Sequence, residues 1–534
     1  MTRNRQPAPW RRARRFLLSL LIGWQSVCLA QVPPAPVQFE VKRFEVDGAW
    51  LLSSDRIDEA LAPFVGPGRT IADIQQARAA LEAAYARRGY GATQVTLPEQ
   101  ELKDGVVRLR VVEARLSRIL VEGNRFFGTA NIRESLPALQ TGAPLNTNRL
   151  AANLQFANEN PAKQATVVLK PGARADEVEA EVRVADQRPY RFSLSLDNTG
   201  TSDTGDYRVG AGFQHANLFD RDQVLNLQYV TSPTQANDVL IFGAGYRVPL
   251  YPLGDSIDLI AGYANVDSGV VQGLFNISGS GRIYAGRYNF GLPRFAGVEQ
   301  KLGLGFDGRY YDNNVVPVGT ATAIVPDYVL HPLSLAYSGA WRGVADEVSF
   351  HASGVRNLPG GSNGDQAQFD LVRPGAPADY TLSRLNVAWV RSFPRDVQGR
   401  LRFTAQYTGD ELLPAEQLGI GGMDSVRGFV ERQFAGDRGY SGTFEIYSPD
   451  LGSRFEVDGL RVRVLAFYDY GRVWQINPQV FEPGVIGIAS AGPGIRIGYK
   501  SNLSARLDYG SVIKNGGAGY PGHGRANFSL VWVF

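Results

Sequence analysis

The sequence predicts two small α+β modules followed by an all-β transmembrane barrel of sixteen antiparallel strands. Three observations predict this class. The chain begins like an exported protein, a β-α-α-β-β pattern occurs twice in tandem, and segments of alternating polarity fill the sequence from about residue 190 onward. The 534 residues include 60 glycines without a fixed period, which excludes a collagen-like chain.

Residues 1–30 are typical of a secretory signal peptide. Arg11 to Arg15 form a basic start, Phe16 to Trp24 form a short apolar stretch, and Ala30 ends a small-residue cleavage site. A membrane anchor is the alternative, but an anchor needs about 20 apolar residues and this stretch is about half as long. We therefore expect cleavage near Ala30.

The leader also explains the net charge and the single cysteine. The formal charge of +3 includes six arginines of the leader, and the remaining chain carries −3. This removes the charge argument for nucleic-acid binding. Cys28 is the only cysteine and would leave with the leader, which excludes disulfides, cysteine catalysis and thiolate metal sites.

The first module is expected at residues 38–113, after a short proline-rich linker at 31–37. Its helix pattern is clearest after Thr70, a candidate N-cap, where Ile74, Ala77, Leu81 and Tyr85 recur at helical spacing. Strand patterns lie on both sides of the helical region, which gives an α+β module.

The second module is expected at residues 114–188 as a loose repeat of the first. A strand near Ile119 is followed by helices around Ile132–Leu139 and Asn146–Asn160, and then by two strands joined at Pro171-Gly172. Two units at this spacing indicate tandem domains rather than a solenoid, which needs at least three shorter repeats.

The barrel is expected at residues 189–534. Each strand has an apolar, often aromatic face and a face of Arg, Asn, Gln, Ser or Gly, as in transmembrane barrels. The alternatives are a soluble β-sandwich or a propeller, which the signal peptide and the outward aromatics disfavour. The candidate strands start near residues 191, 207, 223, 237, 256, 278, 300, 327, 343, 379, 397, 439, 460, 488, 503 and 525.

The sequence gives no sign of enzyme chemistry, a cofactor or a metal. Gly303 to Gly308 has dinucleotide-loop spacing, but no βαβ unit surrounds it. The four histidines lack close ligand spacing, and no local Ser/His/Asp signature occurs. We expect no catalytic residues, metal ligands or cofactors.

A long segment of about residues 409–438 interrupts the alternation, and long loops usually have a function. It contains a glycine pair and an arginine beside an aromatic residue, which describes a tight turn that presents one guanidinium. The residues of this loop motif are Gly421, Gly422, Val426, Arg427, Gly428 and Phe429.

This loop motif resembles the sixth extracellular loop of two-partner secretion outer-membrane transporters (TpsB), which include the haemolysin activation/secretion and filamentous-haemagglutinin transporters. In that family the loop folds into the lumen, and its arginine meets an acidic residue of a Phe-x-Asp-x-Gly strand. The next strand carries Gly-x-Gly-x-Arg. The matching barrel-wall residues are Phe467, Asp469, Gly471, Gly492, Gly494 and Arg496.

The resemblance extends over nearly all of the predicted mature chain. The barrel opening from Leu196 to Arg208 is similar to that of the family, and the two modules would be POTRA domains. A terminal aromatic on an amphipathic strand resembles the insertion signal of outer-membrane barrels. This signal comprises Phe528, Leu530, Trp532 and Phe534.

The resemblance implies outer-membrane translocation of a large unfolded exoprotein with an N-terminal secretion domain. The POTRA domains would lie in the periplasm of a Gram-negative-type bacterium, with the lipid bilayer and the barrel-assembly machinery as further partners. An outer-membrane protein assembly factor of the same superfamily is the main alternative, and a porin or an outer-membrane enzyme is a third. Some relatives carry a pore-plugging N-terminal helix, for which residues 31–37 leave no room.

Overall fold

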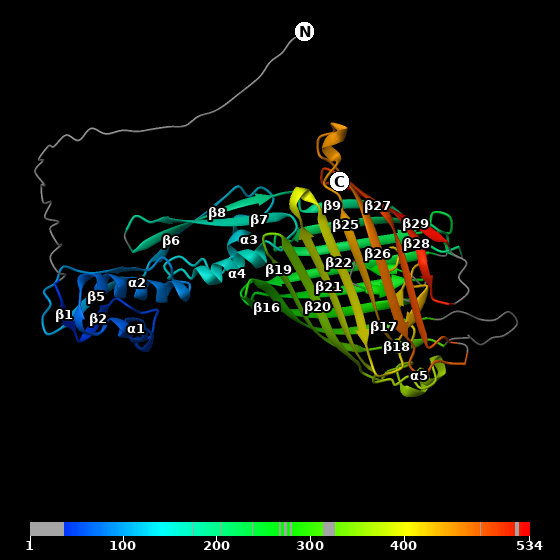
Figure 1. Cartoon of the computed structure of the whole chain (residues 1–534), viewed down its shortest axis with the longest axis horizontal. Coiled ribbons are helices and arrows are strands. Elements are labelled where there is room, and N and C mark those ends of the chain that lie inside the picture. The colour runs from blue at the N-terminus through cyan, green and yellow to red at the C-terminus, as the bar shows by residue number, and fades with distance from the viewer. Residues whose placement is uncertain are drawn as a thin grey trace, which may run out of the picture.

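The structure of the chain is a computed structural model that describes residues 37–534 except 175, 203, 238, 266–268, 272–274, 278–279, 313–325, 481 and 518–522. Two small modules extend from one end of a barrel (Figure 1). The expected signal peptide and residues 31–36 of the linker lie outside the described residues. No helix in the described ranges is long and apolar enough to cross a membrane.

The first module has a three-stranded sheet in the order β2-β5-β4, with a parallel β2–β5 pair. The Thr70 hydroxyl caps helix α2 by accepting a bond from the Asp73 N–H, and the Asp73 carboxylate accepts one from the Thr70 N–H. Leu81 and Tyr85 of this helix are fully buried in the core. The elements are β1 (Phe39–Val41), β2 (Arg43–Asp47), α1 (Ser54–Leu61), the 3₁₀ turn η1 (Ala62–Phe64), β3 (Gly66–Arg69), α2 (Ile71–Arg87), β4 (Gln94–Thr96) and β5 (Val106–Val112).

The second module has the sheet order β6-β8-β7 and its own core, which includes Leu116, Ile132 and Leu136. Helix α3 ends at Glu134 rather than near Leu139, because Pro137 disfavours helical backbone in the residue before it. The elements are β6 (Arg115–Glu122), α3 (Thr129–Glu134), α4 (Thr147–Ala157), β7 (Lys163–Pro171) and β8 (Glu177–Asp186).

Asn146 joins the two modules where α2 ends and α4 begins. Its Oδ1 accepts from the Arg149 N–H at 3.0 Å and caps α4, while its Nδ2 donates to the Arg88 carbonyl at 2.9 Å. The Thr147 N–H donates to the Gly89 carbonyl at 2.8 Å. One side chain therefore serves both helix ends, and α2 and α4 follow one another along the arm (Figure 1).

Sixteen antiparallel strands of the described chain form a closed barrel, as the sequence predicts; β18 and β19 pair with the same neighbour and make one interrupted strand. The expected starts agree closely, and β12 begins at Leu240 where residue 237 was expected. The barrel strands are β9 (Tyr190–Asp197), β10 (Arg208–Leu218), β11 (Gln223–Thr231), β12 (Leu240–Leu250), β13 (Asp255–Ala264), β16 (Gly281–Phe295), β17 (Val298–Tyr311), β18 (Tyr328–Leu330), β19 (Pro332–Arg342), β20 (Asp346–Asn357), β21 (Thr381–Ser392), β22 (Gln398–Tyr407), β25 (Arg438–Tyr447), β26 (Leu460–Trp474), β27 (Val485–Tyr499), β28 (Leu503–Asn515) and β29 (Gly524–Val533).

Alternation along the strands directs large apolar side chains outward, as a lipid-facing wall requires. Examples are Phe192, Leu259, Phe306, Leu335, Phe444, Tyr468, Leu507 and Trp532, each more than a third exposed. Gly305 lies on β17, where an added Cβ would approach Arg287 and Ser334 to 2.6 Å. The Gly303–Gly308 pattern therefore belongs to a barrel strand rather than a nucleotide loop.

The connections between strands contain short elements that the alternating pattern did not predict. Helix α5 follows β20, and its N-terminus is capped by Asp365. These elements are β14 (Gly269–Val271), β15 (Phe275–Ile277), α5 (Gln366–Val372), η2 (Pro394–Asp396), β23 (Leu418–Ile420), β24 (Phe434–Gly436) and η3 (Gly452–Phe455).

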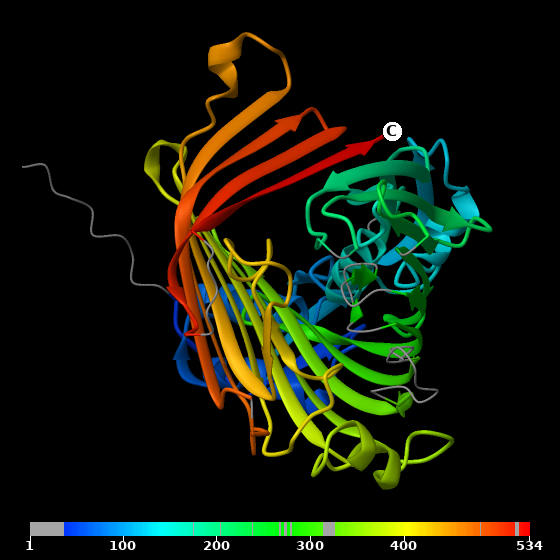
Figure 2. The same ribbon diagram turned by 90° about the vertical axis from the view of Figure 1, so that its right-hand side faces the viewer.

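The segment between β22 and β25, residues 408–437, folds back between the barrel walls. Figure 2 shows this yellow segment inside the ring of strands. Its short strands β23 and β24 pair with one another, and buried residues dominate its tip. We call this segment the inward loop.

Candidate functional site

Arg427 at the tip of the inward loop binds Asp469 of β26. Its Nε and Nη2 atoms donate to the two carboxylate oxygens at 2.7 and 2.8 Å, and its backbone N–H donates to the same carboxylate at 3.1 Å. Both side chains are fully buried. This bidentate, charge-assisted contact has the geometry in which an arginine–carboxylate pair is strongest.

Phe467 lies under the Arg427 guanidinium, with 3.4 Å between the guanidinium carbon and the ring centroid. Phe467 and Asp469 of the Phe-x-Asp-x-Gly strand thus contact the same guanidinium. The Phe467 ring lies against its flat face, and the Asp469 carboxylate binds its edge. A buried cation over an aromatic ring gains about 2 kcal/mol. Gly471 completes the strand motif, since an added Cβ there would meet Val426 at 3.0 Å and Ile420 at 3.2 Å.

Three residues that sequence reasoning missed complete this charge cluster: Glu445, Asp508 and Arg506. Arg427 also donates to Glu445 at 2.8 Å and lies 3.6 Å from Asp508. Arg506 binds Asp508 at 2.7 Å. Each missed residue lies on the polar face of an alternating strand, a signal that is present in the sequence but is shared with many other positions.

Arg496 of β27 donates to the two oxygens of Asp508 at 2.8 and 3.1 Å and lies 3.6 Å from Glu445. Arg506 also binds Asp424 of the loop at 2.7 Å, and Asp424 lies 3.9 Å from Arg402. Four guanidinium groups and four carboxylates are therefore in contact, so the cluster balances its charges. Gly494 makes room for it, because an added Cβ would collide with Asp508. At Gly492 an added Cβ would lie 3.2 Å from the Phe467 ring and would also collide with the Tyr509 carbonyl.

The loop tip depends on glycines where the backbone turns. Gly421, Gly422 and Gly428 have φ values of 107°, 106° and 93°, a region that disfavours other residues. At Gly428 an added Cβ would also lie 2.8 Å from the Gly510 carbonyl of the wall. The loop therefore approaches the barrel closely enough to bring the Arg427 backbone within reach of Asp469.

Val426 and Phe429 of the motif face the wall rather than solvent. Both are fully buried and belong to an apolar cluster with Val473, Ile486 and Ile488 of β26 and β27. The tip thus combines an ionic contact with an apolar contact on the same side of the lumen. Together they fix the loop tip inside the lumen against this part of the wall.

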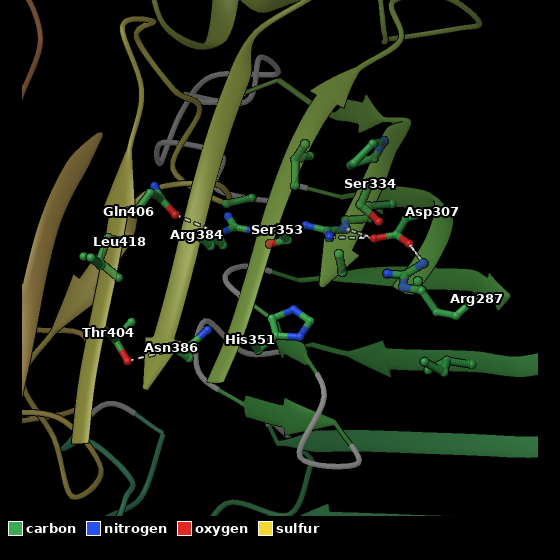
Figure 3. Close-up of a pocket in the computed structure, with 18 of the residues that line it drawn as sticks. Arg287, Asp307, Ser334, His351, Ser353, Arg384, Asn386, Thr404, Gln406 and Leu418 are labelled. Carbon is green, nitrogen blue, oxygen red and sulfur yellow. Dashed lines mark hydrogen bonds and ion pairs between the residues drawn. The ribbon is translucent and has the colours of Figure 1, made fainter. Parts of the chain in front are cut away.

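The inward loop makes a second set of contacts on another part of the wall. Glu416, which is fully buried, accepts from Arg309 of β17 at 2.5 Å and from Arg384 of β21 at 2.8 Å. Beside these residues lies a polar cavity of about 680 Å³ between the loop and the wall. Figure 3 shows Arg384, Gln406, Asp307 and Arg287 around it.

The second module is docked on the short β10–β11 and β12–β13 turns of the barrel through Lys163 of β7. Its ammonium binds Asp222 and lies 5.4 Å from the centroid of the Phe127 ring, and both charged side chains are almost completely buried. Tyr251 of the next turn also donates to Asp222. Burial lowers the pKa of Lys163, an effect that Asp222 opposes.

The last strand closes the barrel against the first. The backbone groups of Phe534 and Phe192 exchange two hydrogen bonds of 2.9 Å, which extend the β29–β9 pairing to the final residue. Leu530, Trp532 and Phe534 are exposed on the outer face, while Phe528 is half-buried. The seam also contains Asn198, whose Oδ1 accepts from the Phe528 N–H at 2.9 Å.

Comparison with protein families finds two matches. The ShlB-type POTRA domain matches residues 39–114, and the haemolysin secretion/activation protein family ShlB/FhaC/HecB matches residues 178–280 and 342–497. The second match contains the inward loop, Asp469 and Arg496.

Among individual proteins, the heme/hemopexin transporter protein HuxB of Haemophilus influenzae is 21% identical over 480 residues, covering 86% of this chain and 82% of HuxB. The outer membrane transporter CdiB-2 of Burkholderia pseudomallei is 25% identical over 525 residues, covering 90% of this chain and 81% of CdiB-2. The solved structure of CdiB from Escherichia coli is similar in fold, with a TM-score of 0.77, 21% identity, and coverage of 94% of this chain and 92% of CdiB.

Proposed function

The chain belongs to the ShlB/FhaC/HecB family of two-partner secretion transporters of the outer membrane, and from that premise we propose that it captures one unfolded exoprotein and threads it outward through the barrel. The family is one of transporters rather than enzymes. The observation that carries the proposal is the inward loop, which lies inside the lumen and is held there by noncovalent contacts alone. A loop held in this way can move to admit a chain.

Capture is assigned to the periplasmic modules. Strands β2 and β4 are the sheet edges of the first module, and β6 and β7 are those of the second. An extended polypeptide can add to such an edge through backbone hydrogen bonds, independently of most of its sequence. This mode suits an unfolded substrate, which presents extended backbone along much of its length.

Gating is assigned to the Arg427 contact. The tip must leave the β25–β28 wall before a polypeptide can pass on that side, and Asp469 holds it there through both side chain and backbone. Release would leave Asp469 and Glu445 facing the lumen, with Arg496 still beside Glu445. The family resemblance agrees with this role, while the geometry supplies its physical basis.

The direct test is secretion in cells. The chain is expressed with a candidate exoprotein that has an N-terminal secretion domain, and the exoprotein is measured in the medium and in the periplasm. We expect export that depends on the chain. Export that continues in a strain lacking the chain would contradict the proposal.

The same strains separate the proposal from the assembly-factor alternative. A transporter leaves the amounts of unrelated outer-membrane barrels unchanged when it is removed, whereas an assembly factor lowers them. Capture is tested with the full chain in detergent against an unfolded N-terminal fragment of the exoprotein. The full chain is needed because Ala216 and Tyr251 of the barrel contribute to the core of the second module.

A further inference from the structure

We propose that Glu416 is a second latch, independent of Arg427, that holds the base of the inward loop on a different part of the lumen wall and keeps the pore closed. The inference rests on the proposed function only in assuming that the exoprotein passes through the lumen. It concerns a residue outside the loop motif that defines the resemblance.

The contacts of Glu416 hold its side chain in one position on the barrel wall. Both carboxylate oxygens are used, Oε1 by Arg309 and Oε2 by Arg384, and the side chain has no exposed surface. Its backbone carbonyl accepts from the Gln406 amide at 2.8 Å, and the same amide donates to the carbonyl of Asp437 at 2.9 Å. Gln406 of β22 thus ties together the two limbs of the loop beside the latch.

The barrel wall around Glu416 carries more arginines than carboxylates, which favours a carboxylate at this position. Asp307 binds Arg309 at 2.6 Å and also pairs with Arg287. Glu416 therefore supplies the second carboxylate for a wall that holds Arg287, Arg309 and Arg384. Without it, three guanidinium groups would face one carboxylate, and the wall would repel rather than hold the cationic side chains of the loop.

The two latches lie on different parts of the barrel. Arg427 is held by β25, β26 and β28, whereas Glu416 is held by β17 and β21. The inward loop is therefore attached to two separate parts of the wall, and the cavity of Figure 3 lies next to the Glu416 end. Release of one contact leaves the loop held at the other, so full opening requires the release of both.

The test measures channel activity in planar bilayers with the purified full chain and no exoprotein. Four variants are compared with the unchanged chain: Glu416→Gln, Arg427→Ala, the double variant, and Asp379→Asn as a control. Asp379 lies outside the inward loop, and its carboxylate is 57% exposed beside Arg356, so its loss changes charge without touching a latch. Heat-modifiable migration on gels verifies that each barrel is folded.

We expect the double variant to raise the fraction of open channels at least about tenfold over Arg427→Ala alone, as loss of a buried ion pair predicts. Asp379→Asn should resemble the unchanged chain. Equal channel activity in Arg427→Ala and the double variant would overturn the proposal, as would an equal effect of Asp379→Asn.

If Glu416→Gln does not insert, Arg384→Gln replaces it. This change removes one of the two arginines that bind Glu416, at a partly exposed position. In combination with Arg427→Ala, it should give a fraction of open channels between those of Arg427→Ala and of the Glu416→Gln/Arg427→Ala double variant. No rise with Arg384→Gln over Arg427→Ala would count against the latch. Because no exoprotein is present, the result is independent of whether the chain secretes one.

Discussion

Arg427 holds Asp469 through its backbone as well as its side chain: the Arg427 N–H and the guanidinium Nε share one carboxylate oxygen, at 3.1 and 2.7 Å. This arrangement fixes the path of the loop and the position of the charge in one contact. It also explains why the neighbouring residue is Gly428, since only close approach of the backbone to the wall brings the Arg427 N–H within reach.

The first prediction concerns Arg427→Ala. We expect export of the exoprotein to be strongly reduced while the barrel still inserts and migrates as a folded species, because the strands retain their own hydrogen bonds. Arg427→Lys should also be defective, since an ammonium cannot make the bidentate contact. Secreted exoprotein is measured against inserted barrel on the same gel, and normal export by an inserted Arg427→Ala barrel would remove the role given to this residue.

The second prediction concerns Phe467→Leu. Loss of the ring beneath Arg427 should weaken the loop contact by about 2 kcal/mol, less than loss of the guanidinium itself, and should reduce export only in part. Phe444→Leu is the matched control, because Phe444 is exposed on the outer face of β25. An equal defect in the two variants would show that the ring acts through the barrel wall rather than through Arg427.

The architecture was predictable from the sequence because it depends on alternation and helical spacing, both of which are local. The strands that begin at Leu460 and Leu503 lie where the pattern predicts them. The sequence could not predict α5 within a barrel region that otherwise lacks helical periodicity, since a seven-residue helix leaves too few apolar repeats. The β1–β3 ribbon was also missed, because Gly66-Pro-Gly-Arg69 looks like a turn.

Site residues that belong to a compact sequence motif could be predicted. Residues that meet only because of how neighbouring strands align could not. Arg427 and Asp469 belong to recognisable motifs, although 42 residues separate them. Glu445 and Asp508 reach Arg427 only because β25, β26 and β28 bring them to the same depth of the lumen. Glu416 lies in a segment without periodicity, so only the folded loop shows that it faces Arg309 and Arg384.

The third prediction concerns the joint between the modules. Asn146→Ala removes the cap of α4 and the bond to Arg88, and should cost about 1 kcal/mol and widen the range of angles between the modules. Asn146→Asp keeps a capping oxygen but places a carboxylate against the Arg88 carbonyl. We therefore expect Asn146→Asp to preserve α4 yet loosen the joint, as measured by distances between spin labels on the two modules. Unchanged distances in both variants would mean that other contacts hold the two modules together.

The fourth prediction concerns the buried pair of Lys163 and Asp222, which docks the second module on the barrel. Asp222→Asn leaves the ammonium buried without its counter-charge, which costs about 3–5 kcal/mol. We expect faster hydrogen exchange in β7 and α4 of the full chain in detergent. The double variant Lys163→Met/Asp222→Asn removes both charges and should exchange more slowly than Asp222→Asn alone. The reverse order would mean that the ammonium finds another partner within the joint.

The same pair predicts a dependence on pH with a definite sign. Burial lowers the pKa of Lys163 below its usual 10.5, and loss of Asp222 removes the attraction that opposes this shift. Because the folded pKa is lower than the unfolded one, the folded state disfavours the proton, and stability rises as the pH rises through the folded pKa toward 10.5. Docking in Asp222→Asn should therefore recover in alkaline buffer, while Lys163→Met/Asp222→Asn, which has no ammonium to titrate, should show no such recovery. Recovery of both variants to the same extent would assign the pH effect to other groups of the interface.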